Sequence, residues 1–395
     1  MRLARSTAAL LGAVALVVPP VQLRAQPHLP PVQAGPPAAA ATSPRRVAIP
    51  APRRRVGVWL TNSPSPLYYD ATRIERAVAE LAGAGFNTLY PNVWSRGTTF
   101  HRSSYAPLEP ALARSGAGLD PICRMAAAAH RRGMQVIPWF EYGLMEPADA
   151  EVVQRHPEWL LARRDGSTTM DLHGKPMAWL NPAHPGVRQR FVGLVSEIVR
   201  RCGLDGIQLD DHFAWPVQFG YDTYTRALYS SETGREPPDD FTDRAWMRWR
   251  RQQLTSLLRE LRRTLPPPTV ISLSPGPFRS AYNLWLQDWE LWAVGNLIDD
   301  LVVQNYAYSV AGFARDLNQP ALVKAKGWGM PVEIGILAGF GGRTPTMQVL
   351  SEKTRLSFAR GHGVIYFYWE GLWGQHAGPE GGTARRATFA QLHRE

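Results

Sequence analysis

The stretch Gly206-Ile207-Gln208-Leu209-Asp210-Asp211-His212-Phe213 decides how the rest of the sequence is interpreted. Apolar and polar residues alternate up to Leu209 with the period of a β-strand, and two adjacent carboxylates follow. In parallel α/β folds the C-terminal ends of the strands carry the functional side chains. Adjacent carboxylates at such an end are costly unless they bind a proton, a cation or a ligand rich in hydroxyl groups. The stretch therefore predicts a functional site at the end of a parallel strand.

Seven more runs of the same kind flank this strand and are separated by segments with helical periodicity. The predicted strands cover residues 56–61, 88–94, 135–142, 206–213, 269–274, 301–306, 332–337 and 364–369. Eight such units with right-handed crossovers close into a (β/α)8 TIM barrel, an α/β fold, here with long loop insertions after strands three (143–184) and four (214–240). An open doubly wound sheet is the alternative, but no Gly-rich phosphate loop follows strand one.

The N-terminal segment differs in composition from the rest of the chain. Arg2 and Arg5 precede an apolar run from Ala8 to Val18, and residues 1–25 are therefore predicted to be a signal peptide. Residues 26–54, rich in Pro, Ala and Arg, are predicted to be a disordered linker, and residues 55–395 the barrel. We expect an exported protein, periplasmic or extracellular, without stable membrane insertion after signal cleavage. An uncleaved anchor is the alternative. No Cys follows the apolar run, so lipid anchoring is not expected.

The net charge of +11 does not indicate a nucleic-acid partner. Residues 1–55 hold eight Arg and no acid, so the remaining residues account for only +3 of that charge. The predicted barrel is therefore nearly neutral, and no nucleic-acid-binding motif accompanies the charge. The two cysteines, Cys123 and Cys202, each lie in a predicted helix. We expect both to be buried as small hydrophobic residues and not to form a disulfide framework.

In a barrel, the ends of all eight strands form one rim, where carboxylates, amides and aromatic rings gather in this sequence. Lys and Arg are nearly absent from the predicted strand ends. This mixture suits a neutral polyol, because amides and carboxylates bind hydroxyl groups while aromatic rings stack on sugar faces. The residues predicted to bind substrate are Asn92, Trp94, Trp139, Tyr142, His212, Trp215, Gln304, Tyr306 and Trp369.

Glycoside hydrolysis needs two carboxyl groups, about 5–5.5 Å apart for retention of configuration and about 6.5–9.5 Å apart for inversion. Asp210 and Asp211 are neighbours on one strand, so we expect one of them to face the barrel mouth and the other to hold the scaffold. The partner carboxyl is predicted to be Glu141 or Glu370. Glu141 follows two aromatic residues, which would raise its pKa as a general acid requires. Alternatively, Glu141 pairs with a rim cation such as Arg96.

Two other functions remain open from the residues alone. Asp210, Asp211 and His212 could hold a metal ion in a hydrolase or deacetylase, but no second His stands at ligand spacing, so neither a metal nor another cofactor is expected. The same rim could also serve a barrel that binds glycans without cleaving them.

At these residues the chain resembles the glycosyl hydrolase-like family 10 group of exported bacterial proteins, in its cyanobacterial-type branch. The resemblance is carried by Val58-Trp59-Leu60-Thr61, His156-Pro157-Glu158-Trp159, Trp179-Leu180-Asn181-Pro182, Asp205 to Phe213, Ser272-Leu273-Ser274-Pro275, Gln304-Asn305-Tyr306, Phe140-Glu141-Tyr142-Gly143 and Tyr368-Trp369-Glu370. It implies a TIM barrel that acts on glycans, which in some relatives are peptidoglycan strands stripped of stem peptides. It also implies a catalytic role for Asp210 and Asp211. We therefore expect an exported glycoside hydrolase that acts on a polysaccharide, with peptidoglycan glycan as a candidate.

Overall fold

The computed structural model describes residues 51–62, 65–115, 118–172, 174–340 and 342–395. The signal peptide and nearly all of the linker predicted from the sequence therefore lie outside the described residues. Among the helices that are described, none has the length and apolar character needed to cross a bilayer.

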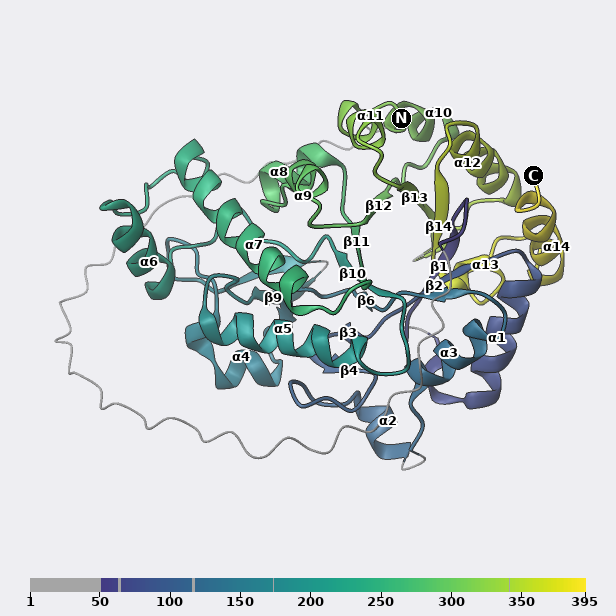
Figure 1. Ribbon diagram of the computed structural model, residues 1–395, viewed down its shortest axis with the longest axis horizontal. Coiled ribbons are helices and arrows are strands. Elements are labelled where there is room, and N and C mark those ends of the chain that lie inside the picture. The colour runs from purple at the N-terminus through teal and green to yellow at the C-terminus, as the bar shows by residue number, and fades with distance from the viewer. Residues whose placement is uncertain (1–50, 63–64, 116–117, 173, 341) are drawn as a thin grey trace, which may run out of the picture. The chain divides into compact units, whose positions relative to one another are not determined.

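A ring of parallel strands forms the centre of the barrel (Figure 1). The hydrogen-bonded order is β5-β2-β1-β14-β13-β12-β11-β10-β6. The bounds are β1 (Val56–Leu60), β2 (Thr88–Pro91), β5 (Gln135–Val136), β6 (Trp139–Phe140), β10 (Gly206–Asp210), β11 (Val270–Ser274), β12 (Asp300–Gln304), β13 (Val332–Leu337) and β14 (Gly363–Phe367). Every one of the eight predicted strands is present.

The ring closes because β5 and β6, at the two ends of that order, are halves of one strand. Pro138 interrupts the strand, since proline has no N–H to donate to the ladder. Pairing continues across the interruption: the Ile137 N–H donates to the Leu89 carbonyl at 2.9 Å, and the Gln208 N–H donates to the Pro138 carbonyl at 2.7 Å. The sheet is thus an eight-stranded barrel, and the prediction of a (β/α)8 fold is confirmed.

The inside of the barrel is filled by side chains from alternate positions of the strands. Trp59 lies at its centre with Tyr90, Trp139, Val302 and Ile365 packed nearby. The Trp59 indole N–H donates to the Gln208 side-chain oxygen at 2.7 Å. This contact explains why a polar residue stands in the middle of the strand that leads to Asp210.

The opposite end of the barrel from the predicted mouth is closed by buried charges. The Arg55 guanidinium lies 2.6 Å from the Asp300 carboxylate and 3.7 Å from Glu333. Burial raises the pKa of Glu333 to about 8, although the positive charge of Arg55 opposes this. Glu333, near the start of β13, is therefore a buried acid at this end of the barrel.

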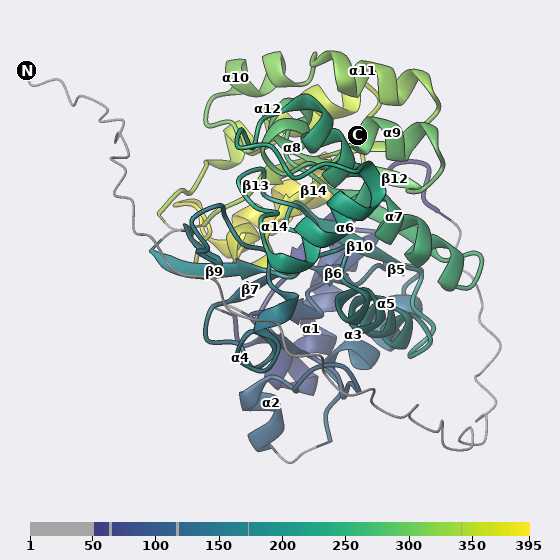
Figure 2. The same ribbon diagram turned by 90° about the vertical axis from the view of Figure 1, so that its left-hand side faces the viewer.

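Helices cover the outside of the strands (Figures 1 and 2). Asp70 caps the helix that begins at Ala71 and Asp120 the helix that begins at Pro121, and each side chain accepts the backbone N–H of the residue three positions on. The stretches near 284–294 and 313–325 each hold two short helices, because Asp288 and Pro320 begin new ones. The bounds are α1 (Ala71–Gly83), α3 (Pro121–His130), α5 (Pro185–Val199), α7 (Arg244–Thr264), α8 (Phe278–Leu284), α9 (Trp289–Val294), α10 (Val310–Asp316), α11 (Pro320–Gly327), α12 (Met347–Ala359) and α14 (Gly382–Leu392).

The two predicted insertions are folded segments. The first contains a three-stranded antiparallel sheet, β7-β9-β8, and the helix α4, and the second contains α6. Asn181 joins the two insertions, because its side-chain amide donates to the hydroxyl of Thr225 at 2.8 Å. The remaining elements are β3 (Trp94–Ser95), β4 (Thr98–Thr99), α2 (Pro110–Ser115), β7 (Met145–Pro147), α4 (Glu151–Arg155), β8 (Thr169–Leu172), β9 (Lys175–Trp179), α6 (Thr223–Thr233), α13 (Trp369–Leu372) and two 3-10 turns (Leu67–Tyr69, Pro157–Trp159).

Cys123 and Cys202 form a disulfide bond, and the prediction that they are separate buried residues is wrong. Cys123 lies in the first turn of α3 and Cys202 in the turn after α5, with their Cα atoms 5.0 Å apart. Both residues are partly exposed. Because 79 residues separate them in sequence, only the packing of the two segments brings them together.

Reduction of this disulfide is expected to destabilise the barrel. The bond closes a loop between residues 79 positions apart, and its removal restores conformational entropy to the unfolded chain. This gain should lower the free energy of unfolding by about 4 kcal/mol. Urea unfolding with and without reductant measures the effect. The Cys123→Ser/Cys202→Ser double variant serves as the control, because its unfolding midpoint should be low and insensitive to reductant. A wild-type midpoint that does not move on reduction would contradict the bond.

Candidate active site

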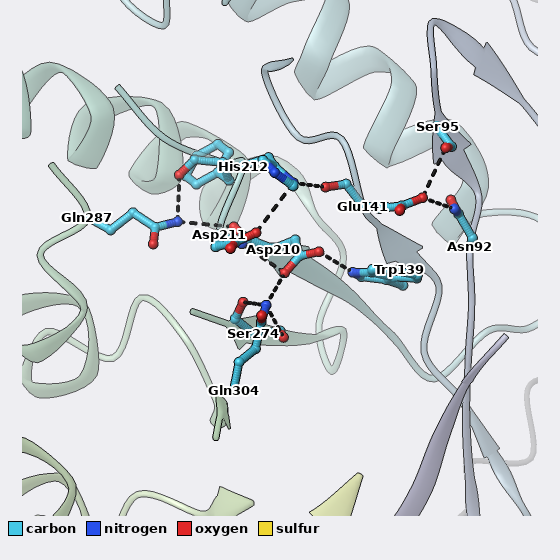
Figure 3. A network of polar contacts seen from close by, with 11 residues as sticks. Asn92, Ser95, Trp139, Glu141, Asp210, Asp211, His212, Ser274, Gln287 and Gln304 are labelled. Atoms are coloured by element: carbon cyan, nitrogen blue, oxygen red, sulfur yellow. Dashed lines mark hydrogen bonds and ion pairs between the residues drawn. The ribbon is translucent and has the colours of Figure 1, made fainter. Parts of the chain in front are cut away.

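Asp210 is the last residue of β10, and its carboxyl group points into the barrel (Figure 3). Its Oδ2 accepts the indole N–H of Trp139 at 2.8 Å. Its Oδ1 accepts the side-chain amide of Gln304 at 2.9 Å and the backbone N–H of Asp211 at 2.8 Å. Donors from three strand ends therefore hold this carboxyl in one orientation, and the residue is only 3% exposed.

The environment of Asp210 favours its protonated form. Burial raises its pKa well above the usual range, and the negative charge of the neighbouring Asp211 raises it further. The N–H donors act in the opposite direction, because a hydrogen bond to a carboxylate stabilises its charge. A buried carboxyl with a raised pKa at the end of a barrel strand is typical of a catalytic site.

Asp211 and His212 lie beyond the end of the strand and are more accessible than Asp210. The Asp211 side chain is 31% exposed, and its Oδ1 lies 3.3 Å from the Nδ1 of His212. The same His212 nitrogen lies 2.9 Å from the backbone carbonyl of Glu141. His212 thus connects the end of β10 to the end of β6, and the two aspartates occupy different environments.

Glu141 follows β6 and is held on one side only. Its Oε2 accepts a short hydrogen bond from the amide of Asn92 and one from the Ser95 hydroxyl at 2.9 Å. Its Oε1 has no hydrogen-bond partner among the described residues. Burial raises the pKa of Glu141, and the charge of Arg96 is the largest influence in the opposite direction. The free oxygen and the raised pKa fit a carboxyl group that donates a proton.

Arg96, the cation considered from the sequence as a partner for Glu141, lies beside a rim that holds few other cations. Its guanidinium lies 5.9 Å from the ring centre of Tyr142, next to Glu141. The two charged groups form no ion pair within the described residues, so the alternative in which Arg96 neutralises Glu141 directly is not what the structure shows. Arg96 follows the short strand β3, which is not one of the eight barrel strands whose ends form the predicted rim.

Aromatic rings flank the carboxyl groups on two sides. Burial raises the pKa of Tyr306, and the charges of Asp210 and Asp211 raise it further, so its phenol lies near both acids. The Tyr306 ring lies 5.7 Å from that of Phe367, and the Phe367 ring lies 6.0 Å from that of Phe340. On the other side, Tyr142 lies 6.1 Å from His212. Sequence reasoning missed Phe340, which is 48% exposed, because it lies beyond a strand end in a loop.

Three of the predicted stacking tryptophans are buried instead. Trp94 donates its indole N–H to the Gly143 carbonyl at 3.1 Å, and Trp215 donates to that of Phe219 at 2.9 Å. Both are fully buried, so neither is available to stack on a substrate. Trp139 is 3% exposed and contributes a hydrogen bond to Asp210. The aromatic character of these positions reflects packing, which a sequence pattern does not separate from substrate binding.

Trp369 and Glu370 lie in the short helix α13, where the chain has turned away from β14. Trp369 lines a cavity with Arg73 and Arg76 of α1. Glu370 is buried, and its Oε2 accepts the backbone N–H of Gln375 at 3.2 Å. The Glu370 carboxylate therefore stabilises its own turn.

The donor atoms of Asp210, Asp211 and His212 lie within 4.8 Å of one another, as a metal site would require. However, both oxygens of Asp210 already accept N–H donors, and the Nδ1 of His212 faces a carbonyl. A metal ion would have to displace these contacts. The arrangement therefore fits a hydrogen-bonded carboxyl pair better than a ligand set.

The sequence model of the family described as glycosyl hydrolase-like 10 matches residues 54–354. The chain belongs to the glycosyl hydrolase-like 10 family. Glycosyl hydrolase DigH of Escherichia coli (strain K12) is 25% identical over 261 residues, which are 56% of this chain and 55% of DigH. Glycosyl hydrolase YngK of Bacillus subtilis (strain 168) is 21% identical over 212 residues, 50% of this chain and 38% of YngK. This glycosyl hydrolase-like chain thus spans about half or less of the length of the curated relatives it matches.

Solved structures agree with the fold of this glycosyl hydrolase-like 10 member. The glycoside hydrolase domain of PgaB (BpsB) from Bordetella bronchiseptica superposes with a TM-score of 0.64 at 12% identity, covering 87% of this chain and 98% of that domain. A variant of the α-galactosidase AgaA from Geobacillus stearothermophilus gives 0.53 at 12% identity, over 87% and 42%. At this identity the likeness shows the barrel fold alone. The family membership supports a function of the glycosidase type.

Replacing Asp211 with Asn is expected to stabilise the protein at neutral pH. The folded-state pKa of Asp210 is raised, partly by Asp211, so ionising Asp210 opposes folding as pH rises above its unfolded value of 3.8. Removing the neighbouring charge should increase the free energy of unfolding by about 1 kcal/mol at pH 8. The gain should vanish at pH 3, where both groups are protonated in the unfolded chain.

Chemical unfolding across this pH range provides the measurement. Asp240→Asn is the matched control, because hydrogen bonds from Thr242 lower the pKa of that exposed acid, so its replacement should reduce stability at neutral pH. A loss of stability in Asp211→Asn at pH 8 would contradict the like-charge interaction.

Proposed function

We propose that this chain is an exported glycoside hydrolase that cleaves a polysaccharide, with Glu141 and Asp210 as its two catalytic carboxyl groups. The observation that carries the proposal is that two differently held carboxyl groups follow the paired strands β6 and β10 at the barrel mouth. Asp210 is fixed by three N–H donors, and Glu141 has one oxygen without a hydrogen-bond partner among the described residues. Family membership supports it. The glycan strand of peptidoglycan is the first substrate to test, since the resemblance of the motifs implies it.

Glu141 acts as the general acid in this proposal. Oε2 is held by Asn92 and Ser95, which leaves the proton on Oε1, the oxygen that is free to face a leaving group. The raised pKa keeps that proton in place at a pH where a free glutamic acid would have lost it. As the glycosidic bond breaks, the proton moves from Oε1 to the leaving-group oxygen.

Asp210 is the second carboxyl. Asp210 acts in its ionised form, which the N–H donors of Trp139, Gln304 and the Asp211 backbone favour against the effect of burial on its pKa. In that form it stabilises or attacks the positively charged sugar ring that develops as the bond breaks. Asp211 tunes Asp210 by its charge and is the alternative for this role. Tyr142 and Tyr306 supply aromatic surface on either side, suited to the apolar faces of a sugar.

Replacing either catalytic carboxyl is expected to reduce cleavage strongly. Glu141→Gln should lower kcat by about 10²–10⁴ on a natural glycan, because general acid catalysis is lost. The loss should be much smaller on an aryl glycoside, whose leaving group needs no proton. Asp210→Asn should impair both substrates. Release of new reducing ends measures the rates, with circular dichroism to confirm that each variant is folded.

Gln154→Ala, an exposed change in α4 away from the mouth, serves as the control for ordinary surface substitution. Full glycan cleavage by Glu141→Gln, Asp210→Asn and Asp211→Asn would exclude this assignment. Binding of the glycan without any cleavage by the wild type would favour a glycan-binding barrel, and loss of activity with chelator that a divalent metal restores would favour a metal-dependent hydrolase.

The pH dependence of kcat is expected to respond to Arg96. Glu141 must be protonated to act, so activity should fall as pH rises through its raised pKa, above the usual 4.5. The positive charge of Arg96 lowers that pKa, so Arg96→Gln should move the falling limb to higher pH, whereas Arg96→Lys, which keeps the charge, should leave it nearly unchanged. Rate profiles of the three proteins from pH 4 to 9 test this. A shift to lower pH in Arg96→Gln would contradict the assignment of Glu141.

A further inference from the structure

A groove runs along the outer side of α5, away from the barrel mouth. It consists of two adjoining cavities of about 500 and 420 Å³ that share Tyr105 and Gln189. Helix α5 lies on the outside of the barrel beside α7 (Figures 1 and 2). The residues that line the two cavities include none of those proposed to carry out the reaction.

Two aromatic rings pack directly against glycines of α5. A Cβ atom at Gly193 would lie 2.3 Å from two ring carbons of Tyr105, and one at Gly186 would lie 2.7 Å from the indole of Trp159. Only glycine lets both rings lie this close to the helix backbone. Seven residues separate the two glycines, which is about two helical turns or about 10 Å. The groove therefore presents two rings at a fixed spacing.

Contacts with the rest of the chain hold these rings in place. The Arg190 guanidinium donates to the Tyr105 carbonyl at 3.1 Å. His156 stacks on Trp159 with ring centres 3.8 Å apart and planes 10° from parallel. The backbone N–H of Asn181 donates to the Trp159 carbonyl at 2.8 Å. The motif His156-Pro157-Glu158-Trp159 thus contributes to this groove and takes no part in the proposed catalysis.

Polar side chains lie between and around the rings. Gln189 is exposed and stands on α5 between the two glycines, one turn from each. Ser104, Glu151 and Arg155 border the larger cavity. Tyr105 is 39% exposed and the His156 side chain, which covers Trp159, is 40% exposed, so Tyr105 and the outer ring of the stacked pair are accessible. Aromatic rings interspersed with amide, hydroxyl and charged groups suit a carbohydrate, which offers C–H faces and hydroxyl groups together.

We propose that this groove is a second glycan-binding site, which holds a neighbouring segment of the polysaccharide while the barrel mouth cleaves another. One sugar stacks on Tyr105 and a second on the His156–Trp159 pair, and Gln189 binds hydroxyl groups of the segment between them. A spacing of two helical turns corresponds to about the length of a disaccharide in an extended chain. The ligand class rests on the proposed function, whereas the groove itself does not.

The test compares polymer binding with the cleavage of short substrates. Tyr105→Ala and Gln189→Ala change exposed side chains and leave the packing of Trp159 against Gly186 intact, and Gly193→Val displaces the Tyr105 ring. In a Glu141→Gln background, Tyr105→Ala should weaken binding to denuded peptidoglycan glycan strands about tenfold in cosedimentation, the loss of one stacked ring. In the otherwise wild-type enzyme, kcat/KM on a tetrasaccharide from the same strands should stay unchanged. Arg200→Gln, a change of an exposed side chain that lines the smaller cavity, is the control for a substitution in the groove that removes no aromatic ring.

The outcomes separate this site from the proposed function. Unchanged polymer binding in both Tyr105→Ala and Gly193→Val would overturn the groove as a glycan site, even if the enzyme cleaves glycans normally. Equal losses on polymer and tetrasaccharide would overturn it as well, because they would indicate a defect of the mouth or the fold. If Tyr105→Ala weakened the binding of peptides and left the binding of glycan unchanged, the groove would be a peptide site instead. Weakened polymer binding in an enzyme that cleaves nothing would keep the groove and reject the proposed function.

Discussion

The arrangement of the barrel mouth depends on how the carboxyl group of Asp210 is held inside the barrel. Trp139 donates to one oxygen and Gln304 to the other, so the ends of β6, β10 and β12 meet at a single carboxyl group. Beneath it, the Gln208 side chain accepts from Trp59 and donates to the Ser272 hydroxyl at 3.0 Å. These layers place a poorly solvated acid at the mouth in one orientation, which is the preorganisation that acid–base chemistry needs.

The three acids at the barrel mouth differ in burial and in hydrogen bonding. Asp210 is buried and bonded on both oxygens, Asp211 is half-exposed beside His212, and Glu141 is bonded on one oxygen only. Neighbouring carboxyls with unequal surroundings take unequal pKa values, and this inequality allows one of them to give a proton while another stays charged. In the proposed reaction, Tyr142 and Tyr306 offer the sugar an aromatic surface on which to stack.

The barrel could be predicted from the sequence because each strand has a local signal. Apolar and polar residues alternate along the strand, and turn residues follow it. Asp210, Asp211 and Glu141 could be identified as candidates for the same reason, since the topology places every strand end on one rim. Contacts between distant segments could not be predicted. The pairing of Cys123 with Cys202 and the turn that takes Glu370 away from the mouth depend on packing, and the burial of Trp94 and Trp215 in place of stacking has the same origin.

Glycan cleavage in water enriched in oxygen-18 shows whether the carboxyl groups at the mouth act by hydrolysis. If the carboxyls at the mouth break a glycosidic bond by hydrolysis, denuded glycan strands incubated with the enzyme should yield fragments that carry one labelled oxygen at each new reducing end, as mass spectrometry would show. The Asp210→Asn protein should produce none. Fragments without the label, or an intact glycan after prolonged incubation with folded enzyme, would contradict the account.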